Sequence, residues 1–189
     1  MRRIALVFLG LVTLGCSTKA PVADLAAYTA LGEWRQAGEA QWRFAGQGVA
    51  AGPAEKTGFL VSPGRYRNVT ITAEFWIEDD TNSGMFVRCK DPATLTPFDC
   101  YEVNIWDNHP QQENRTGSIV TRQSPLAHVD TLGKWNRCRI ELRGDTIMVT
   151  INDVLTARLV DDQLREGHIA LQYAGKGLLR FRNVRLSVD

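Results

Sequence analysis

The sequence predicts a nearly all-β domain, folded as a sandwich or a barrel. The first reason is a strict two-residue alternation of apolar and polar side chains over residues 69–77, which is typical of a strand buried on one face. The second is that further short alternating segments follow at intervals of about 8–15 residues, separated by turn-forming residues. The third is that the same region shows no convincing 3.6-residue period, which argues against helices.

The strands are expected in the following order. The first covers 69–77, and a turn cluster at 79–84 (Asp-Asp-Thr-Asn-Ser-Gly) leads to a second over 85–89. A third strand covers 101–106, and two more over 137–142 and 146–151 flank Gly144 and Asp145. Asn152 and Asp153 then form a turn into a strand over 154–160, and the last strands cover 168–173 and 179–188. The alternation slips between Phe181 and Val184, which predicts a bulge at this point.

The composition is that of an ordinary globular protein. The chain has 189 residues, 44% of them hydrophobic and 23% charged, and a formal net charge of +1. This length suffices for one domain with a core of its own. The even charge balance argues against a nucleic-acid-binding protein, which usually carries a basic excess.

The N-terminus has the pattern of an export signal. Arg2 and Arg3 precede an apolar run over 4–14, and Gly15-Cys16 follows, as at a bacterial lipoprotein cleavage site. We therefore expect a signal peptide over 1–15 and a lipid-anchored protein of the bacterial cell envelope that faces the periplasm; the alternative is an ordinary signal peptide and a soluble exported protein. Residues 16–31 would then carry the lipidated Cys16 and a tether, and residues 32–189 the folded domain. Without the signal, the formal charge becomes −1.

The faces opposite the apolar ones carry the candidate functional residues. They are Glu74 and Trp76 on the first strand, Phe86 and Arg88 on the second, and Glu102, Asn104 and Trp106 on the third. The short connections make the three strands expected neighbours, so these side chains would share one surface. Aromatic rings with carboxylates and amides suit a carbohydrate ligand, and paired carboxylates can cleave a glycosidic bond. The alternative is a solvated face with cross-strand ion pairs.

Other residues give weaker indications. Asp107 and His109 follow the third strand, where His109 could act as an acid, a base or a ligand, or could simply be exposed. The sequence contains no cofactor-binding motif and no spacing of residues typical of a metal site. Binding of a divalent metal is left as an open alternative. Cys89 and Cys100 stand at facing ends of an expected hairpin, so we expect a disulfide between them. We expect Cys138 to be a buried free thiol.

Several motifs together resemble the 3-keto-disaccharide hydrolase domain family. They are Asn82-Ser83-Gly84-Met85 with Arg88, the segment 101–107 (Tyr-Glu-Val-Asn-Ile-Trp-Asp), 116–119 (Thr-Gly-Ser-Ile), Trp135-Asn136, 167–172 (Gly-His-Ile-Ala-Leu-Gln) and 181–185 (Phe-Arg-Asn-Val-Arg). The resemblance covers residues 32–188. The sequence has Asn104, Val120 and Ala174 where the family pattern has Gln, Tyr and a His-Gly pair.

The resemblance implies a concanavalin-like jelly-roll sandwich of two antiparallel sheets. It also implies cleavage of glycosides whose glucose carries a ketone at carbon 3, a substrate that a partner sugar 3-dehydrogenase would supply. Arg88, Glu102, Asn104 and Asp107 would line the site, and Gln172, from the matching segment 167–172, would bind the substrate. Glu102 or Glu74 would abstract the proton at carbon 2, and Arg88 would stabilise the enolate. The alternatives are a carbohydrate-binding lipoprotein without catalytic activity and an envelope interaction protein that merely uses the fold.

Overall fold

The computed structural model describes residues 22–24, 33–45, 48–53, 56–78 and 81–188. The expected signal peptide and Cys16 lie outside these residues. Val22–Asp24, within the expected tether, form strand β1 and pair with the last strand of the domain. The sheet therefore includes residues ahead of Gly32. Among the described residues, no helix has the length and apolar character needed to cross a bilayer.

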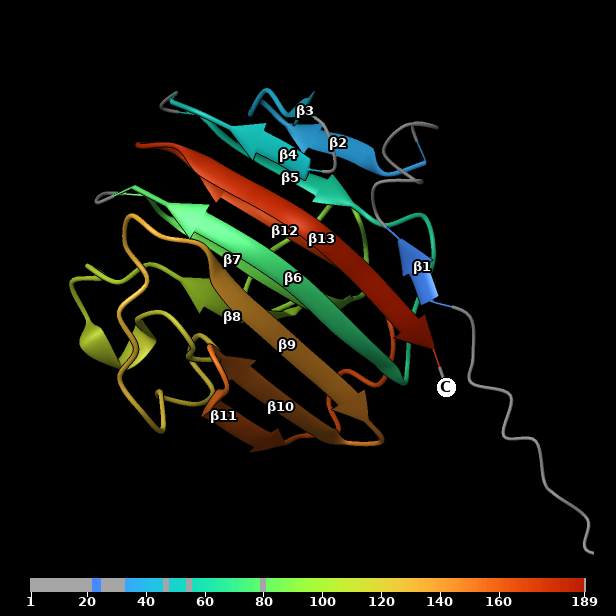
Figure 1. Cartoon of the computed structure of the whole chain (residues 1–189). Coiled ribbons are helices and arrows are strands. Elements are labelled where there is room, and N and C mark those ends of the chain that lie inside the picture. Colours follow the sequence, from blue (N-terminus) through green and yellow to red (C-terminus); the bar gives the residue numbers. More distant parts are fainter. Residues whose placement is uncertain (1–21, 25–32, 46–47, 54–55, 79–80, 189) are drawn as a thin grey trace, which may run out of the picture.

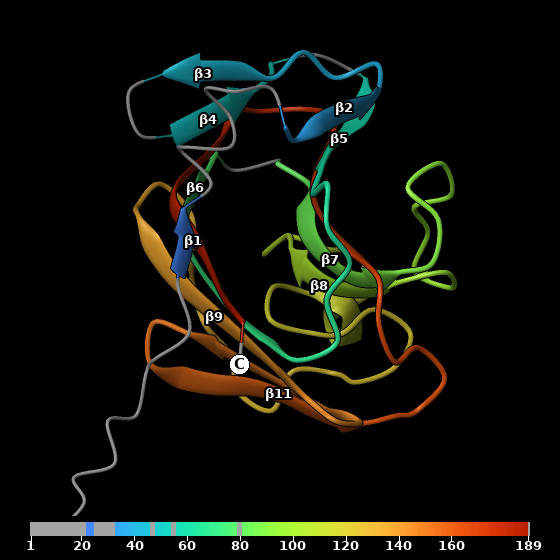
Figure 2. The ribbon, with the colours of Figure 1, turned by 90° about the vertical axis from the view of Figure 1, so that its right-hand side faces the viewer.

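The strands form two antiparallel sheets that pack face to face (Figures 1 and 2). Sheet A has the order β11-β10-β9-β6-β13-β4-β3, with β1 also paired to β13. Its strands are β1 (Val22–Asp24), β3 (Arg43–Ala45), β4 (Gly48–Ala51), β6 (Val69–Ile77), β9 (Asn136–Arg143), β10 (Thr146–Ile151), β11 (Val154–Val160) and β13 (Leu179–Val188). Sheet B has the order β2-β5-β12-β7-β8. Its strands are β2 (Arg35–Gly38), β5 (Thr57–Val61), β7 (Ser83–Cys89), β8 (Tyr101–Ile105) and β12 (His168–Ala174). A 3-10 turn, η1 (Gln112–Asn114), follows β8.

The core lies between the two sheets and follows the predicted alternation. In β6, one face is buried throughout, with Val69, Ile71, Ala73, Phe75 and Ile77. On the other face, Thr70 is buried, and Thr72, Glu74 and Trp76 are partly exposed. β8 contributes Tyr101, Val103 and Ile105 from the other sheet. Burial of this apolar surface is the main stabilising contribution to such a sandwich. The all-β, two-sheet prediction is confirmed.

The prediction that the first three strands, 69–77, 85–89 and 101–106, are neighbours in one sheet is wrong for the first of them. β6 pairs with β9 and β13 in sheet A, whereas β7 and β8 pair with each other in sheet B. The segment after β6 therefore passes from one sheet to the other and does not close a hairpin. Consecutive strands are neighbours in only about two-thirds of cases, and alternation alone does not distinguish a hairpin from a crossing.

Two bulges interrupt the alternation. The predicted one is present in β13: Asn183 has a φ of 52°, and the register with β6 shifts between Arg182 and Arg185. The other was not expected and lies at Arg88, where φ is 54° and the register between β7 and β12 shifts. Because of this bulge, Val87 and Arg88 are both directed into the protein.

The predicted disulfide between Cys89 and Cys100 is present. It links the end of β7 to the residue before β8, so it closes the loop over 90–99. Both cysteines pack on the outer side of sheet B with Phe86 and Ala170. Cys138 is a buried free thiol, also as predicted, and burial raises its pKa to about 12.

Candidate functional site

The outer face of sheet B carries the candidate site. Two rows of side chains cross its strands: Gln172, Gly84 and Asn104 form one row, and Ala170, Phe86 and Glu102 form the next. In Figure 2 this face lies on the side opposite β6 and β9, and the loops after β7 and β8 extend from it. Backbone hydrogen bonds join β8 to the segment 116–120, which continues the sheet on that side.

Glu102 is the chemically distinctive residue of this face. Its side chain is only 6% exposed, and no described residue forms a hydrogen bond or an ion pair with it. Burial raises the pKa of its carboxyl group from 4.5 to about 7. Neither carboxylate oxygen is among the fully buried polar atoms without a partner, so the remaining exposure includes the carboxylate. A reachable carboxyl group with a pKa near 7 is suited to general acid or base catalysis.

Gly84 makes room for this carboxyl group. A Cβ atom at Gly84 would lie 3.0 Å from Oε1 of Glu102, 3.2 Å from its Cγ and 3.3 Å from the ring of Phe86. A side chain there would displace the carboxylate, so the position needs glycine because of a close approach and not because of its backbone angles. This explains why the chain has glycine inside a buried strand, where glycine usually weakens the sheet.

We expect Gly84→Ala to lower kcat/KM about 10- to 100-fold on a substrate that needs Glu102, because a displacement of about 1 Å suffices for such a loss. Stability should change little, since removing a strand glycine offsets part of the crowding. Steady-state kinetics and urea unfolding of the same preparation check this. The control is Gly133→Ala: a Cβ there meets nothing within 4 Å, but the φ of Gly133 is 66°, so this variant should lose stability through backbone strain and keep its kcat/KM. Unchanged kinetics in Gly84→Ala would contradict the assignment of Glu102.

Four buried polar atoms without partners belong to residues on or beside the sheet B face. They are Oε1 of Gln172, Nε1 of Trp106, Oγ1 of Thr116 and Oγ of Ser118. Ser118 is joined to Asn104, and Thr116 to Trp106, by backbone hydrogen bonds of 3.1 and 3.3 Å. Buried polar groups without partners are uncommon in proteins, and a cluster of them indicates bound water or a polar ligand.

Apolar residues continue this face toward β5. The rings of Phe59 and Phe86 meet edge to face, with centroids 5.4 Å apart. Phe86 is only 1% exposed, so it supports the site from below and offers no ring face to a ligand, contrary to the prediction. Phe59 is half-buried and can contact an apolar sugar face. Beyond it lies a cavity of about 640 Å³ that includes Arg35, Val61 and His168.

Arg88 does not face Glu102, which corrects the prediction. Its guanidinium donates hydrogen bonds to the backbone carbonyls of Leu164, Arg67 and Gly144, inside the end of the sandwich. The bulge at Arg88 reverses the direction that strict alternation would give. Its side chain is fully buried and burial lowers its pKa, so it ties segments of the structure together and does not stabilise an enolate.

Asp107 also has a structural role and not the predicted catalytic one. Its carboxylate accepts hydrogen bonds from the backbone N–H of Thr131, at 2.6 Å, and from the Thr131 hydroxyl, at 2.7 Å. It therefore anchors the long loop between β8 and β9. The predicted ligand contact of Asn104 is contradicted as well: Asn104 is buried, and its amide donates to the carbonyl of Asn114.

Trp106 and His109 lie together after β8. Their ring centroids are 4.6 Å apart, and both residues are half-buried. Nδ1 of His109 accepts a hydrogen bond from the backbone N–H of Gln111. Neutral His109 would then carry its proton on Nε2, which leaves that atom as a donor. Of the predicted site residues, Glu102, Gln172, Trp106 and His109 lie on or next to the sheet B face, and their roles stay predictions.

Glu74 and Trp76 lie on the other sheet, so the prediction that they share a site with Glu102 is wrong. The carboxylate of Glu74 accepts hydrogen bonds from Arg182 and Asn183, at 2.7 and 2.8 Å, on the outer face of sheet A. The hydrogen bond from Asn183 is the main cause that lowers its pKa. Glu74 is therefore a carboxylate paired on sheet A and not a second base beside Glu102.

Sequence reasoning missed Gly84, Phe59, Thr116 and Ser118 as parts of the site. Gly84 was assigned to the turn cluster at 79–84, whereas the structure places it inside β7. Gly84, Thr116 and Ser118 did stand in motifs that resemble the family, and no signal singled out Phe59. No group of three or more His, Cys, Asp or Glu residues in the described ranges could hold a metal ion.

The three departures from the family pattern lie near Glu102 and Gln172. Asn104 is two residues from Glu102 on β8, and Val120, in the segment 116–120, is hydrogen-bonded to the backbone of Glu102. Ala174 follows Gln172 on the same face of β12.

The fold matches those of known carbohydrate-related proteins. A candidate glycosyl hydrolase from Parabacteroides distasonis is 22% identical, with a TM-score of 0.68 over 78% of this chain and 90% of that one. The carbohydrate-binding module CBM66 from Bacillus subtilis is 16% identical, with a TM-score of 0.63 over 80% of this chain and 94% of that one. At these identities the likeness shows the fold alone. No curated protein matches the chain.

Sequence comparison goes further than the fold. Residues 24–187, nearly the whole described domain, match the family model of the 3-keto-alpha-glucoside-1,2-lyase-like domain. The match includes both rows of the sheet B face and the loop after β8. This chain therefore belongs to the 3-keto-alpha-glucoside-1,2-lyase-like domain family.

Proposed function

We propose that this protein cleaves 3-keto-glucosides or 3-keto-disaccharides by proton abstraction at carbon 2, with Glu102 as the base. The observation that carries the proposal is the buried Glu102 carboxyl group, whose pKa of about 7 and lack of a partner suit a general base at neutral pH. Membership of the family supports the substrate class.

The chemistry follows from the ketone. A carbonyl group at carbon 3 acidifies the hydrogen at carbon 2, so the Glu102 carboxylate takes that proton and the electron pair of the C2–H bond forms an enolate. When the enolate collapses, the C1–O bond breaks and the aglycone leaves with the electron pair, taking a proton from Glu102 or water. Addition of water across the new C1–C2 double bond then gives the free 3-keto sugar. An ordinary glucoside has no such acidic hydrogen and should be inert.

The enolate needs hydrogen-bond donors, and Arg88 cannot supply them. Gln172 is the candidate on this face: its backbone pairs with Gly84, over which the carboxylate of Glu102 lies. Strands in a sheet are about 4.8 Å apart, so the amide of Gln172 is close to a sugar held at Glu102. His109 offers one further ring N–H donor, on Nε2, after the end of β8.

A pair of chromogenic substrates tests the proposal. We expect the protein to release nitrophenol from a nitrophenyl 3-keto-glucoside and not from the corresponding plain glucoside. Both anomers should be supplied, because the geometry of Glu102 does not define the anomeric preference. Release from neither anomer of the keto substrate would contradict the proposal, and equal release from plain glucosides would indicate ordinary acid–base glycosidase chemistry.

A carbohydrate-binding protein without catalytic activity is the second candidate. It is favoured by one observation: Arg88, Asp107 and Glu74 all lie elsewhere, which leaves Glu102 as the one carboxylate in the two rows that define the site. Titration calorimetry separates the two candidates. Saturable binding of the keto-glucoside with no product formed would support the binding protein.

The setting that we propose is the cell envelope of a bacterium. The signal-like segment over 1–15 and Cys16 support export and lipidation, and a periplasm-facing lipoprotein would meet sugars that enter the cell. The keto substrate requires an oxidising partner, which we propose to be a sugar 3-dehydrogenase. Mass spectrometry of the mature protein would test the anchor, by finding acyl groups on an N-terminal Cys16.

A further inference from the structure

The outer face of sheet A is basic and hollowed. Two adjoining cavities of about 380 and 470 Å³ share Asn183. Their linings contain five arginines and two carboxylates: Arg137, Arg139, Arg180, Arg182, Arg185, Glu74 and Asp153. This local excess of positive charge contrasts with the near-neutral chain as a whole. It lies on the sheet that does not carry Glu102.

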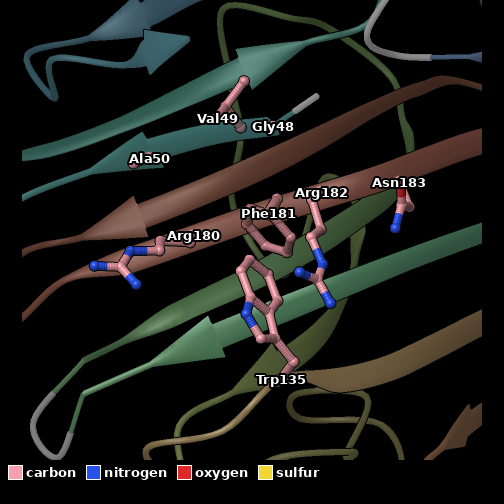
Figure 3. A pocket seen from close by; sticks show the side chains of 8 residues that line it. All are labelled: Gly48, Val49, Ala50, Trp135, Arg180, Phe181, Arg182 and Asn183. Atoms are coloured by element: carbon pink, nitrogen blue, oxygen red, sulfur yellow. The ribbon is translucent and has the colours of Figure 1, made fainter. Parts of the chain in front are cut away.

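Two tryptophans hold two of these arginines in place. The guanidinium of Arg182 lies 3.9 Å from the ring centroid of Trp135, and that of Arg180 lies 4.7 Å from the ring centroid of Trp76. Figure 3 shows Arg182 beside Trp135, with Arg180 further along the same strand. A stacked guanidinium keeps the N–H groups at its edge available, so stacking prepares it to bind an anion.

The carboxylates on this face neutralise only part of the charge. Glu74 is engaged by Arg182 and Asn183, and Asp153 by Arg137. Arg139 is paired with Glu141. Among the described residues, no carboxylate pairs with Arg180, which is exposed on its tryptophan. A cation fixed in position without a counterion is an incomplete site, and an anionic ligand would complete it.

We propose that this face binds an acidic sugar chain, with carboxylates on the arginines and sugar ring faces against Trp135 and Trp76. Trp135 is 37% exposed and thus has ring surface for such a contact. The hydroxyl groups of Thr72 and Thr150 and the amide of Asn183 line the second cavity and suit sugar hydroxyls. A chain fits two adjoining hollows, whereas a flat membrane surface would contact their rims only.

The test compares one polymer in two forms. We expect the full-length protein to bind polygalacturonate, by calorimetry or affinity electrophoresis, and to bind its fully methyl-esterified form at least about tenfold more weakly, because esterification removes the charge that Arg180 would meet. Arg180→Gln should weaken binding to polygalacturonate about five- to tenfold, as expected for loss of one partly exposed charged contact. Arg165→Gln, an exposed arginine paired with Asp162 away from this face, is the matched control and should bind normally.

Other results would overturn the proposal. They are equal binding of both polymer forms, equal weakening in the Arg180 and Arg165 variants, or binding to vesicles of anionic phospholipid in the absence of any binding to polygalacturonate. Glu102→Gln should bind polygalacturonate like the unchanged protein. This result separates the sheet A site from the site on sheet B, whether or not the latter is catalytic.

Discussion

Glu102→Gln is expected to lower kcat on a 3-keto-glucoside by roughly 10²–10⁴-fold, the usual contribution of a positioned general base. Gln has nearly the same shape but cannot accept the proton from carbon 2. In the unchanged protein, activity should rise with pH through about 7, because only the ionised carboxylate acts as a base and burial places its pKa there. The pH dependence of kcat/KM measures this directly.

The same substitution should stabilise the protein at alkaline pH. The pKa of Glu102 rises from 4.5 to about 7 on folding, so between these values the folded state binds more protons than the unfolded state. Stability therefore falls as the pH rises from about 4.5 to about 7, by up to about 3 kcal/mol for a shift of this size. Glu102→Gln removes this loss, so urea unfolding at pH 8 should show the variant to be more stable.

The opposite signs of the two effects make the test specific. If Glu102 had only a structural role, the Glu102→Gln variant would lose stability and activity together. The control is Glu166→Gln, an exposed carboxylate paired with Arg65, for which neither activity nor its pH dependence should change. Full activity in Glu102→Gln, or a midpoint near 4.5 in the unchanged protein, would contradict the assignment.

Arg88→Met is expected to destabilise the protein by about 3–5 kcal/mol, because each buried polar group left without a partner costs about 1–3 kcal/mol. Three backbone carbonyls, from Leu164, Arg67 and Gly144, would each lose a donor inside the protein. Arg88→Lys should also be strongly destabilising, because a single ammonium group cannot reach three carbonyls in the arrangement of a guanidinium fork.

Urea unfolding measures this effect, with Arg165→Met as an exposed control. The fraction that folds should keep its kcat on the keto substrate, since Arg88 does not contact the site on sheet B. If Arg88→Met had normal stability but no turnover, this result would instead indicate that Arg88 stabilises the enolate.

The strands could be predicted closely from the sequence because a half-buried strand leaves a period of two. The range 69–77 agrees with β6 residue for residue, and the bulge at Asn183 left a visible slip in the pattern. The disulfide between Cys89 and Cys100 was predictable for a similar reason, since both cysteines flank one hairpin. These features depend on residues that are close in the chain.

Which residues share the site could not be predicted from the alternation of apolar and polar residues, because it depends on contacts between distant strands. A turn cluster looks the same whether it closes a hairpin or crosses between sheets, so Glu74 and Trp76 were placed on the wrong sheet. The direction of Arg88 depends on one residue with positive φ, which arginine rarely adopts and which no sequence signal marks. Glu102 was identified correctly as a face residue, but its raised pKa follows from burial that the sequence does not reveal.

Hydrogen exchange at carbon 2 of a 3-keto-glucoside in D₂O, followed by proton NMR, tests most directly whether Glu102 is the base. We expect the protein to accelerate the loss of the carbon 2 proton signal, in bound substrate or in product. Glu102→Gln should abolish the acceleration, and Glu166→Gln should not. Product formation with the carbon 2 hydrogen fully retained would contradict proton abstraction, as would undiminished exchange in Glu102→Gln.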